Sequence, residues 1–147
     1  MTPQCNARNG ELPARRTILL VEDEPFVREA TCRILKHAGF EVLVAVDALE
    51  AMQVYDQAGK MVDLVMTDVG LPGRSGRQLG KDVHHLAPQI PVLLTSGYGE
   101  AAANAEREPL DEHTHYLGKP YSRASLVEKV EQILADNSSR RAAVQRG

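Results

Sequence analysis

Four separated stretches of the chain carry side chains that could do chemistry, each at the end of a short apolar run. Glu22 and Asp23 follow the first run, Asp68 ends the second, Thr95 ends the third and Lys119 follows the fourth. Gathered carboxylates repel one another unless a cation lies among them, and an all-oxygen set suits Mg²⁺. A carboxylate beside that cation can attack a phosphoryl group and form an acyl phosphate, helped by the lysine charge and the threonine hydroxyl. Asp23 and Asp68 are the expected direct ligands.

Asp68 taken alone supports two interpretations equally. The apolar run that it ends is followed by a Gly/Pro-rich turn from Gly70 to Gly76. The carboxyl end of a buried strand is where open α/β sheets place their chemistry. Aspartate is also a common turn-forming residue at such a position, with no further role. The other chemical groups must decide between the two.

The elements that position these groups follow from periodicity. Apolar runs predict buried parallel strands over 17–21, 40–45, 62–68 and 91–96, and a weaker pattern that begins with polar residues predicts a fifth over 113–117. Apolar residues spaced three and four apart, or a high alanine content, predict helices over 25–38, 48–58, 76–87, 101–108 and 123–136. This alternation predicts an α/β fold, a parallel sheet with helices on both faces and right-handed connections. The strand ends, and with them the chemical groups, then meet at one edge.

Composition is that of one soluble domain. The chain has 147 residues, 43% of them hydrophobic, and a net charge of −3. The first 16 residues are polar and contain no apolar run, so we expect no signal peptide or membrane anchor and a cytoplasmic location. Acidic residues outnumber basic ones over 17–136, which argues against a nucleic-acid partner. We expect 1–16 to be a disordered tail, 17–136 one domain and 137–147 a polar tail.

Taken together, the motifs resemble the receiver domain of two-component response regulators, the CheY-like superfamily. The resemblance covers residues 17–136 and rests on motifs that occur in the family's order: Glu22-Asp23, Thr67-Asp68-Val69-Gly70-Leu71-Pro72 with Gly76, Thr95, and Lys119-Pro120. It implies a flavodoxin-like, doubly wound five-stranded parallel sheet in the order 2-1-3-4-5 with five helices. It also implies a *cis* bond before Pro120.

The resemblance assigns roles to individual residues. Asp68 corresponds to the phosphorylated aspartate, Asp23 to the metal-binding carboxylate, and Glu22 to an acid that reaches the metal through water. The backbone carbonyl of Gly70 corresponds to the third protein ligand of the Mg²⁺ ion. Lys119 corresponds to the lysine that pairs with the phosphoryl oxygen. The remaining two residues form the switch: Thr95 moves toward the phosphoryl group, and Tyr116 turns inward in response.

Two positions depart from the usual pattern. Gly70 and Gly97 lack side chains at the places that flank the phosphoryl group in the family and influence its hydrolysis. Neither departure removes a reactive atom.

The resemblance implies a phosphoacceptor that is not itself an enzyme. A sensor histidine kinase or a histidine phosphotransfer protein would donate the phosphoryl group to Asp68. Too few residues follow the last helix for an effector domain, so the signal would reach a protein partner through the fourth helix, fifth strand and fifth helix. We expect a monomer or weak dimer, either a stand-alone regulator or the receiver end of a hybrid histidine kinase.

Two other functions remain open. An aspartyl-phosphate phosphatase or phosphotransferase would use the same nucleophile on an external substrate, but haloacid-dehalogenase-type phosphatases need an acid at the position of Gly70. A binding module without phosphorylation is disfavoured because every reactive group is present.

Overall fold

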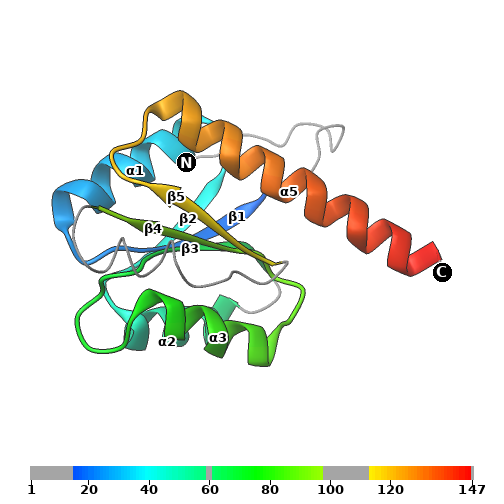
Figure 1. Cartoon of the computed structure of the whole chain (residues 1–147), viewed down its shortest axis with the longest axis horizontal. Coiled ribbons are helices and arrows are strands. Elements are labelled where there is room, and N and C mark those ends of the chain that lie inside the picture. The colour runs from blue at the N-terminus through cyan, green and yellow to red at the C-terminus, as the bar shows by residue number, and fades with distance from the viewer. Residues whose placement is uncertain (1–14, 59–60, 98–112, 147) are drawn as a thin grey trace.

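The computed structural model describes residues 15–58, 61–97 and 113–146, which form an open α/β sandwich (Figure 1). Five parallel strands lie in the order β2-β1-β3-β4-β5, which confirms the predicted fold. In chain order the elements are β1 (Thr17–Val21), α1 (Pro25–His37), β2 (Glu41–Ala45), α2 (Ala48–Ala58), β3 (Val62–Asp68), α3 (Gly76–Leu86), β4 (Val92–Ser96), β5 (Thr114–Gly118) and α5 (Arg123–Arg146). The helix expected over 101–108 lies outside the described residues.

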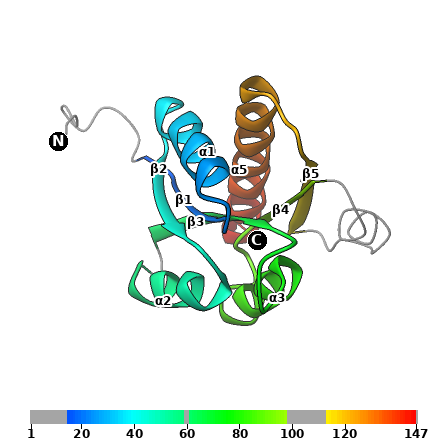
Figure 2. The same cartoon turned by 90° about the vertical axis from the view of Figure 1, so that its left-hand side faces the viewer.

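Helices cover both faces of the sheet: α1 and α5 one face, α2 and α3 the other (Figure 2). The central strands are buried on both sides because their side chains alternate between two apolar cores. In β1, Ile18 and Leu20 enter the core beneath α1 and α5, whereas Leu19 and Val21 enter the opposite core. Burying each such side chain contributes roughly 1.5–3 kcal/mol. This two-sided burial is why the strands appear in the sequence as continuous apolar runs.

Capping side chains define where three of the described helices begin. Glu24 caps α1 and is followed by Pro25 in the first turn, and Ser75 accepts a hydrogen bond from the Gln78 N–H at 3.1 Å. Ser122 likewise accepts from the Ser125 N–H at 3.0 Å at the start of α5. Such caps satisfy backbone donors that have no partner within the helix. They fix the loops that leave the carboxyl edge of the sheet.

Gly76 allows α3 to begin against the end of β3. A Cβ atom at this position would collide with the carbonyl oxygen of Asp68 and lie 2.8 Å from its carbonyl carbon. The Gly76 N–H also donates to the Val69 carbonyl at 3.0 Å. Only glycine permits this close approach, which holds the turn after Asp68.

The prediction that the last helix ends at residue 136 was wrong, because α5 continues to Arg146 through the segment predicted as a polar tail. Asn137 is buried, and the Ser138 hydroxyl accepts a hydrogen bond from Arg16 at 2.7 Å. These contacts carry the helix past residues of poor helix propensity into a stretch rich in Ala, Arg and Gln, which favour helix. The end of α5 extends beyond the sheet in Figure 1. Arg16, placed in the N-terminal tail by the sequence, is therefore part of the folded body.

Smaller differences concern boundaries and one core residue. The second strand begins at Glu41 rather than Phe40, and the fifth covers Thr114–Gly118 rather than 113–117. The carboxyl end of α3 is more exposed than its spacing predicts, since Leu86 is 63% exposed. Across the described ranges, no helix combines the length and apolar character needed to cross a membrane.

Candidate functional site

The carboxyl ends of β1, β3, β4 and β5 meet at one edge of the sheet, as the sequence predicted. Asp68 on β3 is in register with Thr95 on β4, and Ser96 is in register with Gly118 on β5. Lys119 follows directly, with its backbone N–H donating to the Ser96 carbonyl at 2.8 Å. The peptide bond between Lys119 and Pro120 is *cis*, as expected. The parallel strands thus bring residues from distant parts of the chain to one place.

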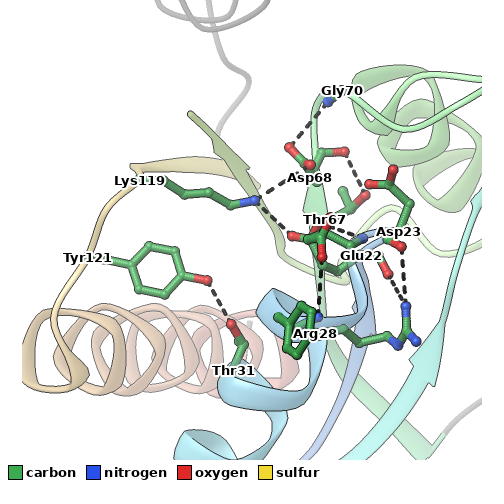
Figure 3. Close-up of polar contacts among 11 residues, drawn as sticks. Glu22, Asp23, Arg28, Thr31, Thr67, Asp68, Gly70, Lys119 and Tyr121 are labelled. Carbon is green, nitrogen blue, oxygen red and sulfur yellow. Dashed lines mark hydrogen bonds and ion pairs between the residues drawn. The ribbon is translucent and has the colours of Figure 1, made fainter. Parts of the chain in front are cut away.

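Three carboxylates gather there. Glu22, Asp23 and Asp68 each offer one oxygen, and these oxygens all lie within 4.8 Å of one another (Figure 3). Glu22 is buried at 4% exposure, Asp68 is half-buried, and Asp23 is exposed. Uncompensated charges this close repel strongly. The set fits a hard divalent cation such as Mg²⁺, which prefers carboxylate oxygens and retains several waters on its open side.

Lys119 neutralises part of this charge. Its Nζ lies 2.8 Å from Glu22 Oε1 and 3.6 Å from Asp68 Oδ2. Burial by itself would lower the pKa of Lys119, but the hydrogen bond to Glu22 and the charge of Asp68 outweigh it and leave the pKa raised. Lys119 is therefore a cation at neutral pH. Burial raises the pKa of Glu22, and the hydrogen bond from Lys119 offsets part of that shift.

The main chain around Asp68 is held from two sides. The Val69 N–H donates to the Thr95 carbonyl at 2.8 Å, and the Thr67 hydroxyl donates to the Asp68 carbonyl at 3.1 Å. The Gly70 N–H donates to Asp68 Oδ1 at 3.3 Å. Gly70 therefore contacts the central carboxylate through its amide, and the role of its carbonyl as a metal ligand stays a prediction.

The two residues predicted to form the switch, Thr95 and Tyr116, lie on neighbouring strands. Thr95 is 2% exposed and adjoins Asp68, while Tyr116 packs against the core on the α2 and α3 side. The Tyr116 hydroxyl lies 2.6 Å from that of Ser96, the residue after Thr95. The arrangement connects the aromatic side chain to the strand that carries the threonine. A movement that couples Thr95 to Tyr116 stays a prediction.

Sequence reasoning missed the side chains that support the site. Arg28 Nη1 donates to the Glu22 carbonyl at 2.9 Å, and the Tyr121 hydroxyl lies 3.0 Å from the Thr31 hydroxyl (Figure 3). Thr31 is buried on the face of α1 that otherwise carries apolar residues, and this spacing alone does not identify a partner for its hydroxyl. A threonine on an otherwise apolar face needs a polar partner, and that was the available signal. Arg28 gave no such signal.

Comparison with known proteins gives a consistent result. The family model described as "Response regulator receiver domain" matches residues 18–131. The sensor kinase CckA of *Brucella abortus* is 35% identical over 124 residues, covering 84% of this chain and 13% of that protein. The response regulator protein FleR of *Pseudomonas aeruginosa* is 37% identical over 115 residues, covering 77% of this chain and 23% of that protein.

The fold of this chain is also similar to the folds of solved receiver-domain and response-regulator structures. The receiver domain from the hybrid histidine kinase CckA superposes with a TM-score of 0.69 at 34% identity, covering 80% of this chain and 98% of that one. NtrX from *Brucella abortus* gives a TM-score of 0.78 at 27% identity, covering 91% of this chain and 30% of that one. The chain thus spans only a part of several longer relatives. With the acidic cluster, the lysine and the fold all in place, this chain belongs to the response regulator receiver domain family of two-component systems.

Proposed function

We propose that Asp68 accepts a phosphoryl group from the phosphohistidine of a sensor histidine kinase or a histidine phosphotransfer protein, in a reaction that requires Mg²⁺. The observation that carries the proposal is the gathering of two further carboxylates and Lys119 around Asp68. Of the three acids, Asp68 is the one at the centre of the four converging strand ends. We propose a cytoplasmic location and a monomer or weak dimer.

The chemistry assigns a task to each side chain. A carboxylate oxygen of Asp68 forms a bond to phosphorus as the bond between phosphorus and the donor's imidazole nitrogen breaks, and the imidazole takes up a proton. Held by Glu22, Asp23 and Asp68, Mg²⁺ would neutralise charge on the phosphoryl oxygens. Lys119 supplies the second positive charge, and the Thr95 hydroxyl donates a hydrogen bond to the transferred group.

The donor needs a surface on which to dock. Phe26, in the first turn of α1, is 83% exposed and lies three residues after Asp23. This apolar ring is accessible to a protein that approaches the end of the sheet where the three acids gather. We propose that the donor packs against Phe26 as it presents its phosphohistidine, and that the signal then leaves toward a protein partner through the face containing β5 and α5.

The alternatives receive less support. A phosphatase or phosphotransferase acting on external substrates would need an acid two residues after its nucleophile, and Gly70 offers only an amide there. A module without phosphorylation would not need a buried acid–lysine pair, which costs desolvation free energy. We therefore propose that the domain is a phosphoacceptor and not an enzyme.

Labelling with a small phosphodonor tests the proposal. Purified protein incubated with acetyl phosphate and Mg²⁺ is expected to gain the mass of one phosphoryl group, and Asp68→Asn is expected to gain none. Asp56→Asn, which removes an exposed carboxylate on α2, is the matched control and should label like the wild type. Undiminished labelling of Asp68→Asn would contradict the proposal.

A further inference from the structure

The loop between β1 and α1 carries two of the three acids, and one arginine holds its main chain. Arg28 lies in the second turn of α1 and is half-buried. Its Nη1 donates to the Glu22 carbonyl at 2.9 Å and lies 3.5 Å from the Asp23 carbonyl (Figure 3). One Nη1 group carries two hydrogens, one for each carbonyl.

The choice of acceptors is informative. Arg28 meets the backbone carbonyls of Glu22 and Asp23 and leaves their carboxylate oxygens to Lys119 and to an incoming cation. An arginine bound to the carboxylates themselves would compete with a metal. Placed on the backbone side, its positive charge reduces the repulsion among the acids without occupying a ligand atom.

Further hydrogen bonds hold the loop that carries Glu22, Asp23 and Glu24 against β2 and α1. The Glu22 N–H donates to the Ala45 carbonyl at 3.0 Å, the Glu24 N–H lies 3.3 Å from Glu22 Oε2, and the Arg28 N–H donates to the Glu24 carbonyl at 2.9 Å. Arg28 thus joins the loop to α1 through both its backbone and its side chain. Groups that orient ligands in this way commonly change metal affinity by about 10–100-fold when they are removed.

We propose that Arg28 is a positioning residue for the metal-binding acids: it fixes the main chain of Glu22 and Asp23 and so sets the affinity for Mg²⁺. The inference rests on the proposed function for its biological meaning. It is nevertheless tested without any phosphodonor, because the quantity that it predicts is the dissociation constant of Mg²⁺ for the unphosphorylated protein.

The experiment is calorimetric titration of Mg²⁺ into four proteins. Arg28→Met removes the guanidinium and keeps the length of the side chain, so its dissociation constant should rise about tenfold. Arg28→Lys keeps the positive charge but has only one side-chain nitrogen. Its dissociation constant for Mg²⁺ should lie between those of Arg28→Met and the wild type. Arg33→Met, which removes a 77% exposed arginine from the same helix, is the control and should match the wild type.

Labelling by acetyl phosphate at saturating Mg²⁺ should recover in Arg28→Met, whereas a disturbed fold would not be rescued by the metal. A dissociation constant for Arg28→Met within twofold of the wild type would overturn the inference. If Arg28→Met does not fold, Arg28→Lys decides the question, and wild-type affinity in that variant would overturn it. If Arg28→Met weakens Mg²⁺ binding while Asp68 of the wild type takes up no phosphoryl group, the inference is supported and the proposed function is contradicted.

Discussion

Glu22 and Asp23 are adjacent in sequence but occupy different environments. Glu22 is 4% exposed and is bound by Lys119 at 2.8 Å, whereas Asp23 is exposed beside the same cluster. Burial raises the pKa of Glu22. An acid whose pKa rises on folding destabilises the native state once the pH exceeds that pKa. The site therefore keeps a buried acid at a cost in stability, as functional sites commonly do.

This difference predicts unequal contributions to metal binding. Asp23→Ala is expected to abolish Mg²⁺ binding because the Asp23 carboxylate is open to an incoming cation. Glu22→Ala is expected only to weaken it, because Lys119 already occupies one oxygen of Glu22. Titration calorimetry on the unphosphorylated proteins measures both, with Asp56→Ala as control. Equal losses would show that the two acids have been assigned the wrong roles.

Gly70 and Gly97 follow the strands that carry Asp68 and Thr95, and both have space around them. Among the described residues, a Cβ atom at either position would meet no heavy atom within 4 Å beyond its immediate chain neighbours, and neither glycine has positive φ. Gly70→Asn should therefore fold normally while placing an amide where it can orient or block the hydrolytic water. We expect the dephosphorylation rate, followed by intact mass after removal of the phosphodonor, to change severalfold. A rate equal to that of the wild type would refute this account of the glycines.

At the scale of elements, α3 is joined to the loop that follows β3. Arg74 in that loop donates to both Asp82 oxygens, with Nε to Oδ2 at 2.6 Å and Nη2 to Oδ1 at 3.0 Å. The hydrogen bonds from Arg74 lower the pKa of Asp82. A lowered acid pKa stabilises the folded state above the unfolded pKa and ceases to do so as the pH falls through the folded value.

Arg74→Gln should therefore lower the melting temperature at pH 7 by a small amount, because solvent reaches both partners: the side chains are 52% exposed in Arg74 and 29% exposed in Asp82. The difference from the wild type should be fully present above the ordinary aspartate pKa of about 3.9 and should shrink as the pH falls through the lowered pKa of Asp82. Lys81→Gln, on the exposed side of α3, is the control. Thermal unfolding followed by circular dichroism measures the difference, and a difference independent of pH would contradict the assignment.

The contact between β4 and β5 gives another prediction at this scale. Ser96 is 3% exposed, and its hydroxyl lies 2.6 Å from the Tyr116 hydroxyl. Tyr116→Phe keeps the ring and leaves the serine without this partner, so we expect a loss of about 1–2 kcal/mol in the free energy of unfolding. Acetyl phosphate labelling of Asp68 should stay within twofold. Urea denaturation measures the loss, and Tyr55→Phe is the control. If Tyr116→Phe were as stable as the wild type, the contact between the Tyr116 and Ser96 hydroxyls would not stabilise the fold.

At the scale of the whole molecule, the sequence pattern predicts which segments form strands and which residues lie at the strand ends. Apolar runs identified the first four strands, and the order of the elements indicated the more polar fifth. The parallel arrangement that they imply placed Asp68, Thr95 and Lys119 together. What escaped prediction depends on contacts between distant segments. Thr31 and Tyr121 are 90 residues apart and meet only when α1 packs beside the start of α5. The extension of α5 likewise depends on tertiary contacts at its middle, which local propensity does not include.

The measurement that tests the central claim most directly is the chemical location of the phosphoryl group. Borohydride reduces an acyl phosphate to an alcohol with loss of phosphate, so a phosphorylated aspartate becomes homoserine. Protein treated with acetyl phosphate and Mg²⁺, then reduced and digested, should contain homoserine at position 68 and nowhere else. The conversion should vanish when Mg²⁺ is chelated. Homoserine at position 23, or conversion at position 68 that is unaffected by chelation, would contradict the account.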